Sequence, residues 1–234
     1  MARGLALHEL MATRQVWQGH AASTPQLGIP TGFAALDAAL PLGGWPRAAL
    51  SELLLPAWGV GELGLLMPTL ARLTAAQARV VLVAPPFIPY AIAWHRAGID
   101  LARLDIIDTA AQDALWAFEQ CLRSGSCAAV IGWPEQADHH AMRRLQVAAD
   151  HGQALGFALR HQRHAGQASP VALRLRLQPG GQLQVLKCRG GPPPAQMLRL
   201  ATMPAANADL ARRPVNSNPV QTTAPEVMPC SGRA

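Results

Sequence analysis

Two kinds of apolar run alternate along the middle of this sequence, and this alternation constrains the fold more than any other feature. Short runs rich in Leu, Val and Ile are separated by longer runs with helical periodicity. The strand-like runs are Leu50–Leu55, Val80–Ala84, Leu104–Ile107, Ala128–Trp133 and about Leu155–Arg160, and the helix-like runs are Leu65–Ala76, Tyr90–Ala97, Ala110–Arg123 and about His139–His151. Such an order predicts an α/β domain whose mostly parallel sheet is covered by helices on both faces.

The end of this region changes character. Leu and Arg alternate between Leu173 and Leu177, and Pro179-Gly180-Gly181 separates this run from Leu183–Lys187. Alternation with a period of two indicates a strand with one wet face, and the glycine pair favours a tight turn. We therefore expect a C-terminal antiparallel hairpin, with Arg174 and Arg176 either on an ordinary solvated face or in contact with DNA.

The sequence divides into three parts. Residues 1–30 predict an N-terminal helix and a linker, residues 31–190 the α/β domain, and residues 191–234 a disordered tail that is rich in proline and lacks periodicity. The N-terminal helix has apolar residues at amphipathic spacing and is our first candidate for binding a partner. These residues are Leu7, Leu10, Met11 and Trp17.

Charge and composition narrow the classes of function. The net charge is +6, and Lys187 is the only lysine, so the excess comes from arginine, which permits nucleic-acid contact without establishing it. No uninterrupted apolar run reaches the roughly 18 residues of a membrane span. The four cysteines lack paired spacing, and the adjacent His139 and His140 cannot face one ion from a helix. We expect a cytoplasmic protein without a metal site.

A degenerate loop follows the first strand-like run. A phosphate-binding loop would read G-x-x-x-x-G-K-[ST] here, with Lys neutralising the phosphates and the hydroxyl holding Mg²⁺. Glycine remains at Gly59 and Gly61, but Leu55, Glu62 and Leu63 take the places of the first glycine, the lysine and the hydroxyl residue. A carboxylate repels a triphosphate and Leu cannot ligate a metal. We therefore expect no nucleotide cofactor and no catalytic residues.

Two aromatic positions have a functional and a structural interpretation. Trp58 lies at the tip of the degenerate loop, where it either fills the vacant pocket or anchors a partner. Trp116, Phe118 and Leu122 follow a helical run, and apolar periodicity favours a buried face over a binding surface.

Several sequence motifs resemble known families. The stretch Thr31-Gly32-x-x-x-Leu36-Asp37 before the first strand resembles the entry to the RecA/RadA ATPase core, over about residues 31–187. The closer resemblance is to the ImuA family, through Gly43-Gly44-Trp45-Pro46-Arg47, Leu53-Leu54-Leu55-Pro56, Gly59-Val60-Gly61-Glu62-Leu63 and Leu65-Leu66. The resemblance implies a RecA-like core of the P-loop type. The RecA positions for the catalytic glutamate and the metal-supporting aspartate fall on residues without a carboxylate, so the resemblance implies no ATPase activity.

The ImuA resemblance implies a function. It predicts a non-catalytic accessory subunit of the damage-induced (SOS) translesion-synthesis mutasome, cytoplasmic and nucleoid-associated after DNA damage. The implied partners are an inactive Y-family polymerase homologue of the ImuB type, an error-prone C-family DNA polymerase and RecA, with direct DNA contact left open. Members of this family are sometimes described as SulA-like, so the alternative is an inhibitor of cell division acting on the tubulin-like division protein.

Overall fold

The computed structural model of the chain describes residues 27–200. The predicted N-terminal helix with Leu7, Leu10, Met11 and Trp17 lies outside these residues, as does most of the predicted tail. The helices are α2 (Ala34–Ala39), α3 (Glu62–Ala75), α4 (Ala91–Arg96), α5 (Ala111–Arg123) and α6 (His139–His151), with 3₁₀ turns η1 (Leu101–Arg103) and η2 (Gln162–Gly166). The strands are β1 (Ala49–Leu55), β2 (Val80–Val83), β3 (Leu104–Ile107), β4 (Ala129–Gly132), β5 (Leu155–His161), β6 (Leu173–Gln178), β7 (Gln182–Cys188) and β8 (Leu198–Arg199).

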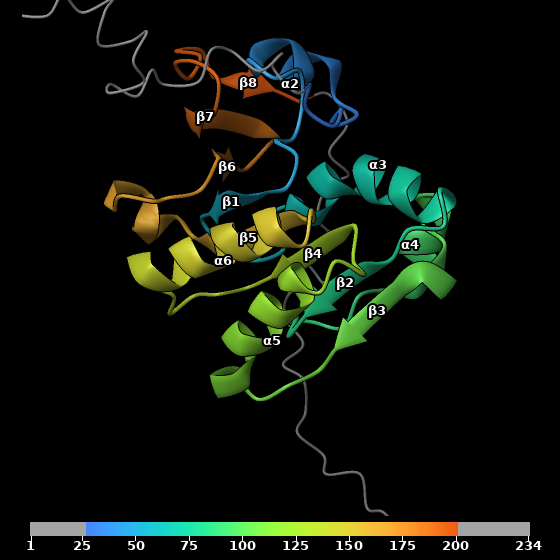
Figure 1. Cartoon of the computed structure of the whole chain (residues 1–234). Coiled ribbons are helices and arrows are strands. Elements are labelled where there is room, and N and C mark those ends of the chain that lie inside the picture. The colour runs from blue at the N-terminus through green and yellow to red at the C-terminus, as the bar shows by residue number, and fades with distance from the viewer. Residues whose placement is uncertain (1–26, 201–234) are drawn as a thin grey trace, which may run out of the picture.

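The strands form one eight-stranded sheet in the order β3-β2-β4-β5-β1-β6-β7-β8 (Figure 1). The pairs from β3 to β6 are parallel, and β6, β7 and β8 pair antiparallel. The mixed α/β fold with a mostly parallel sheet, flanking helices and a C-terminal hairpin is therefore confirmed. β8 lies within the sequence predicted as tail, where it extends the hairpin by one short strand.

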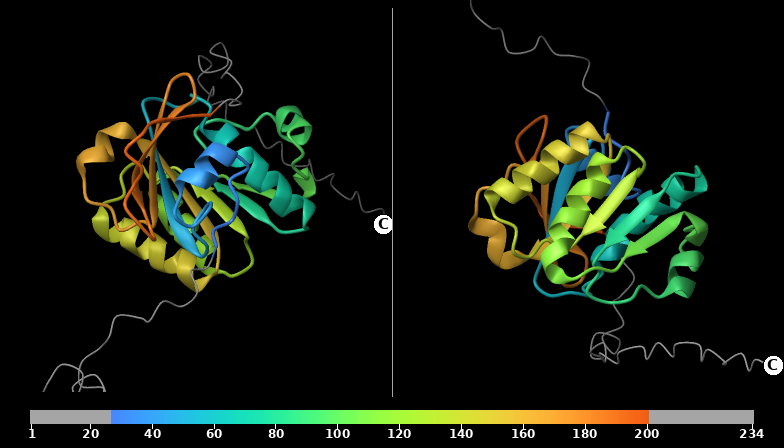
Figure 2. Two further views of the ribbon diagram at one scale, coloured as in Figure 1. Left: turned by 90° about the horizontal axis from the view of Figure 1, so that it is seen from above. Right: turned by 60° about the horizontal axis from the view of Figure 1, so that its bottom comes forward.

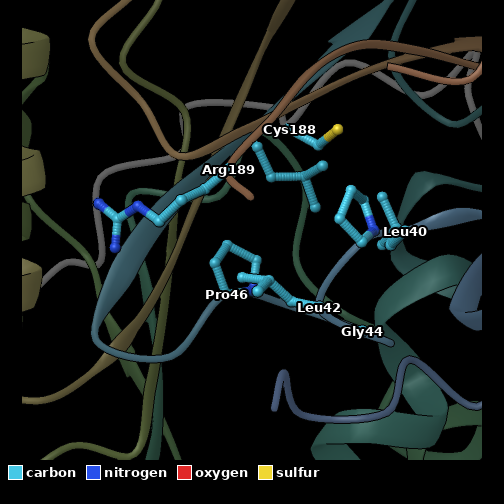
Figure 3. A pocket seen from close by; sticks show the side chains of 8 residues that line it. Leu40, Leu42, Gly44, Pro46, Cys188 and Arg189 are labelled. Carbon is cyan, nitrogen blue, oxygen red and sulfur yellow. The ribbon is translucent and has the colours of Figure 1, made fainter. Parts of the chain in front are cut away.

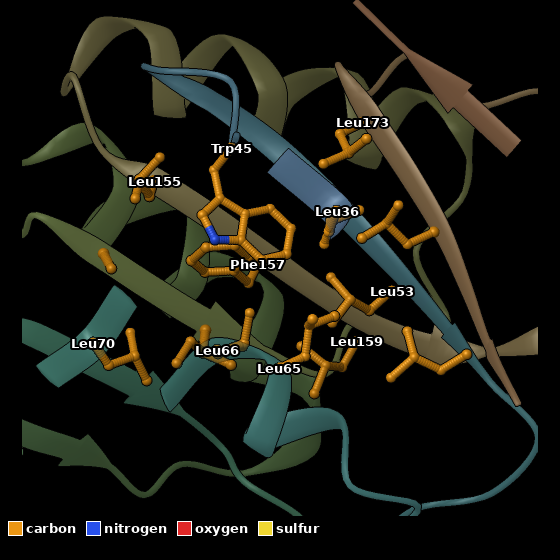
Figure 4. Close-up of a cluster of buried hydrophobic side chains, with 14 of the residues drawn as sticks. Leu36, Trp45, Leu53, Leu65, Leu66, Leu70, Leu155, Phe157, Leu159 and Leu173 are labelled. Atoms are coloured by element: carbon orange, nitrogen blue, oxygen red, sulfur yellow. The ribbon is translucent and has the colours of Figure 1, made fainter. Parts of the chain in front are cut away.

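Helices lie on both faces of the sheet (Figure 2), and each face carries a cluster of buried apolar side chains. α5 and α6 cover one face through buried residues such as Phe118 and Leu145, because their apolar residues recur at helical spacing. α2, α3 and α4 cover the other face, where Trp45 packs edge-on against Phe157 with ring centroids 5.0 Å apart (Figure 4). The indole N–H of Trp45 donates to the hydroxyl of Thr69 at 3.0 Å, so this large side chain is buried without an unpaired polar atom.

The motif that opens the α/β region has a structural role. The carboxylate of Asp37 accepts the backbone N–H of Thr31 at 2.7 Å, which closes the turn before α2. Gly32 has φ +93°, and a Cβ there would lie 2.4 Å from the Cβ of Pro68 in α3. The glycine is required because the turn approaches the helix without room for a side chain.

Two predictions about exposure are wrong. Trp116 is 66% exposed, while Phe118 and Leu122 are buried, because two residues of a helix turn the side chain by about 200°. Arg174 is only 6% exposed, since the segment around η2 covers the face of β6 that the alternating pattern had assigned to solvent. Arg176 on the same face is half-buried.

Among residues 27–200, no helix is long and apolar enough to cross a membrane. Within that same range, no three His, Cys, Asp or Glu side chains are grouped so that they could hold a metal ion.

Candidate functional site

Two segments at the carboxyl ends of β1 and β2 are candidates for a functional site, the first indicated by the sequence and the second by the structure. In an open α/β sheet, loops at the carboxyl ends of parallel strands form the usual binding edge. The first segment is the degenerate loop between β1 and α3, and the second connects β2 to α4.

The loop after β1 is closed by its own carboxylate. Leu55 is the fully buried last residue of β1, and Gly59 and Gly61 have φ of +81° and +98°, a region that favours glycine. Glu62 begins α3 and is 5% exposed, and its Oε1 accepts the backbone N–H of Gly59 at 2.9 Å. The carboxylate thus occupies the space beside the N-terminus of α3, where the helix dipole favours a negative charge.

The second oxygen of this carboxylate is buried and has no hydrogen-bond partner among the described residues. An external anion at this loop would have to displace Glu62 and then remain beside an unneutralised charge. Trp58, Val60 and Leu63 are half-buried and pack against the core on the α3 face. One part of the Trp58 side chain therefore packs against the core, and the rest of its surface is accessible to a partner.

The segment after β2 is apolar and exposed. Phe87, Ile88 and Tyr90 are 40%, 81% and 61% exposed, and Ile92 in the first turn of α4 is 51% exposed. Soluble proteins rarely leave several large apolar side chains so close together unless they bind something. Prolines at 85, 86 and 89 limit the conformations of the segment, so its unfolded alternatives are few.

Both ends of this segment are fixed to the core. The backbone N–H of Ala84 donates to the carbonyl of Ile107 at 2.8 Å, and Ala84 itself has φ +46°, a conformation that costs a non-glycine residue about 1 kcal/mol. Trp94 of α4 is 3% exposed and anchors the other end. The apolar side chains between these anchors are held in place without being buried.

The neighbouring strand carries a further exposed apolar side chain. β3 is the last strand of the sheet, and Ile106 on it is 46% exposed. Ile106 lies on the α4 face, since Leu104 two residues earlier packs against the core on that side. We call Phe87, Ile88, Tyr90, Ile92 and Ile106 the apolar edge; α4 and β3 mark its position at the right of Figure 1.

A small pocket elsewhere is too tight for a ligand. It lies between the loop before β1 and the end of β7, and its lining is mostly apolar (Figure 3). Its volume of about 10 Å³ is close to what one water molecule needs. Cys188 lines it, and burial raises the pKa of this thiol, which makes the thiolate scarcer at neutral pH.

Comparison with known proteins finds a similarity to one family over part of the chain. A family model described as "Cell division inhibitor SulA" matches residues 58–156. The crystal structure of SulA from Pseudomonas aeruginosa is 30% identical to this chain, over 99% of that protein and 50% of this chain, with a TM-score of 0.42. The chain is therefore similar to the SulA family over residues 58–156. No curated protein matches the chain.

The SulA match overturns the resemblance to ImuA, and with it the predicted mutasome function. That resemblance rested on short stretches around β1 and its loop. In such stretches the requirements of turns and of the core also restrict which residues can occur. The alternative, a SulA-like protein, agrees with the comparison. The polymerase and RecA partners stay a prediction that the comparisons do not support.

The matched region contains most of the exposed apolar surface. Eight of the ten large hydrophobic residues that are exposed in the described chain lie within residues 58–156, including the whole apolar edge. The apolar edge was not predicted from the sequence. Its signal was the text Pro85-Pro86-Phe87-Ile88-Pro89-Tyr90, where apolar residues stand between prolines and so cannot belong to a strand or a helix interior.

Proposed function

We propose that this protein is a non-enzymatic inhibitor of cell division that acts by binding a protein partner through its apolar edge. The observation that carries this proposal is the SulA match to residues 58–156, the region that holds the edge. The proposed partner is the tubulin-like division protein, and the proposed location is therefore the cytoplasm.

The geometry of the edge supports protein binding. Aromatic and large aliphatic side chains supply most of the energy of protein interfaces when a partner removes them from water. Phe87, Ile88 and Tyr90 lie on a segment with three prolines and fixed ends, so binding orders little additional chain. The surface is therefore suited to a partner that covers it.

The loop after β1 supports a function without catalysis. Glu62 fills the position where a phosphate would need positive charge, and its contact with Gly59 is internal to the loop. The finer fold assignment, a RecA-like core of the P-loop type, stays a proposal. The β1–loop–α3 unit with two glycines at positive φ supports it, while the family match adds nothing to it.

Overproduction of the full chain alone tests the proposal. An inhibitor of division should produce filamentous cells without DNA damage and without any other added protein. Normal cell length at high protein level would contradict the proposed function.

Substitutions on the apolar edge test the proposed surface separately. Ile88→Asp should abolish filamentation, because it places a charge at the most exposed edge position. Val147→Asp on α6 is the matched control: Val147 is 54% exposed and lies outside the edge, so its substitution should leave filamentation intact. Co-sedimentation with the purified tubulin-like protein should follow the same order. Filamentation by both variants would move the binding surface elsewhere and leave the function standing.

A further inference from the structure

A second site, which is polar, lies on the opposite face of the sheet, away from the apolar edge. Glu52 in β1 is fully buried, and its two carboxylate oxygens contact two guanidinium groups. Nη1 of Arg160 donates to Oε1 at 3.1 Å, and Nε of Arg174 donates to Oε2 at 2.5 Å. One carboxylate therefore serves two arginines that are both less than a tenth exposed, and one buried positive charge remains without a counter-charge.

Four of the five N–H donors of Arg174 are paired, one with Glu52 and three with backbone carbonyls. Its Nη atoms donate to the carbonyls of His164, Ala165 and Gln167 at 2.6 to 3.0 Å. These contacts hold the segment around η2 against the sheet but supply no negative charge. Arg174 is thus a structural group, and the excess charge lies within reach of whatever occupies the adjoining space.

One N–H donor of Arg160 is unpaired among the described residues. Its Nη2 donates to the carbonyl of Ala137 at 2.6 Å and lies 3.2 Å from Nδ1 of His164. Its Nε–H is buried and has no hydrogen-bond partner among the described residues, and the same holds for the hydroxyl of Ser169. An unpaired buried donor normally indicates a missing water or ligand.

Arg160 and Ser169, the residues that carry these unpaired atoms, both line one open pocket. Its volume is about 680 Å³, within the range of small-molecule sites. It lies between the segment after β4, the start of α6 and the segment after η2. Its lining residues are Glu135, Gln136, Ala137, Asp138, His139, Met142, Arg160, His164, Gln167, Ala168, Ser169 and Arg174.

The two carboxylates at this pocket already have partners. Glu135 accepts the backbone N–H of His161 at 2.8 Å, and Arg163 and His164 lie 3.3 Å from its oxygens. Asp138 caps α6 by accepting the N–H of Ala141 at 2.7 Å. The unmet demand in the pocket is therefore for a hydrogen-bond acceptor that carries negative charge.

A neighbouring lysine is affected by the same positive charge. The ammonium of Lys187 donates to the carbonyl of Ser169 at 2.8 Å. Partial burial lowers the pKa of Lys187, and the positive charge of Arg174 lowers it further. A negative ligand in the pocket would relieve this repulsion as well as pair the free donors.

We propose that this pocket binds a small phosphorylated molecule, whose phosphate group contacts Arg160 and Ser169. A phosphate carries the missing negative charge and offers several acceptor oxygens to donors that point from different directions. The remaining volume takes the organic part of the ligand. The site is separate from the apolar edge, so it can fail while the proposed function stands.

Titration of the full chain with inorganic phosphate and with glycerol 3-phosphate, at constant ionic strength in a calorimeter, tests the site. We expect binding of both at a dissociation constant of about 1 mM or below. Ser169→Ala should weaken binding roughly 5- to 10-fold, since it removes one hydrogen bond to a charged group and leaves the three buried ions intact.

Two further variants locate the bound phosphate. Asp138→Asn should tighten binding several-fold, because it removes a negative charge at the pocket while asparagine still caps α6. Arg143→Ala is the control, since Arg143 is exposed on α6 and does not line the pocket, and it should leave the affinity unchanged. Variants that change nothing would place the anion elsewhere and overturn the assignment.

Two other outcomes would also overturn it. If neither probe gives a heat of binding up to about 20 mM, a concentration far above the expected dissociation constant, the pocket is not a phosphate site. Binding of an oligothymidylate by a protein that ignores both small phosphates would show a nucleic-acid surface in place of a small-molecule pocket.

Discussion

The buried carboxylate of Glu52 allows a quantitative prediction. Glu52→Gln keeps the size of the side chain and removes its charge, which leaves Arg160 and Arg174 buried without a counter-charge. The amide also offers an N–H₂ group to one of the two guanidiniums, so a hydrogen bond is replaced by two donors in contact. Breaking a buried ion pair by removing one partner costs about 3–5 kcal/mol.

Urea denaturation of the full chain measures this change. Because the free energy of unfolding of a domain is only about 5–15 kcal/mol, Glu52→Gln should strongly lower the urea concentration at the unfolding midpoint and leave a marginally stable fold. Glu119→Gln is a matched control, since Glu119 also contacts two arginines, Arg123 at 2.9 Å and Arg144 at 3.1 Å. These arginine side chains are 48% and 60% exposed, so the control should cost less than about 1 kcal/mol.

The difference between the stability losses of Glu52→Gln and Glu119→Gln tests whether burial sets the cost. Equal costs would mean that water reaches Glu52 as freely as Glu119, and the argument from burial would be wrong. Replacing all three buried ions by apolar residues of similar size should recover part of the lost stability, because uncompensated charge is gone. Recovery should be incomplete, since three carbonyls near η2 lose their donor.

Three further predictions concern local structure. Glu62→Ala should lower the unfolding free energy by about 1 kcal/mol through loss of the contact with Gly59, whereas Glu62→Gln should cost less because its carbonyl can still accept that N–H; equal costs would contradict this. Gly44→Ala should destabilise by more than about 2 kcal/mol, since its Cβ would lie 2.2 Å from the carbonyl oxygen of Ile29, and an unchanged melting temperature would refute it. A first-turn N–H of α6 lowers the pKa of Asp138, so its contribution to stability is present above the ordinary carboxyl pKa and is lost as pH falls through the lowered value. Asp138→Asn should remove that part of the pH dependence in melting curves.

Local sequence determined the secondary structure and the class of the fold. Alternation with a period of two and recurrence at helical spacing are properties of neighbouring residues, and these patterns predicted β1 to β7 and α3 to α6 to within a few residues at their ends. The degenerate loop was also visible, because Glu62 and Leu63 stand at fixed positions after a strand. What such short stretches could not give was the family, since turn and core positions are shaped by the fold as well as by descent.

The tertiary structure alone decided which side chains face water. Arg174 alternates with leucines like a solvent-facing residue, yet carbonyls from the η2 segment and Glu52 from a strand 122 positions away enclose it. Trp116 follows an apolar helical run but points outward, and the apolar edge depends on β3 being the last strand in the sheet. Burial is set by partners distant in the chain, and no local pattern specifies which partners will meet.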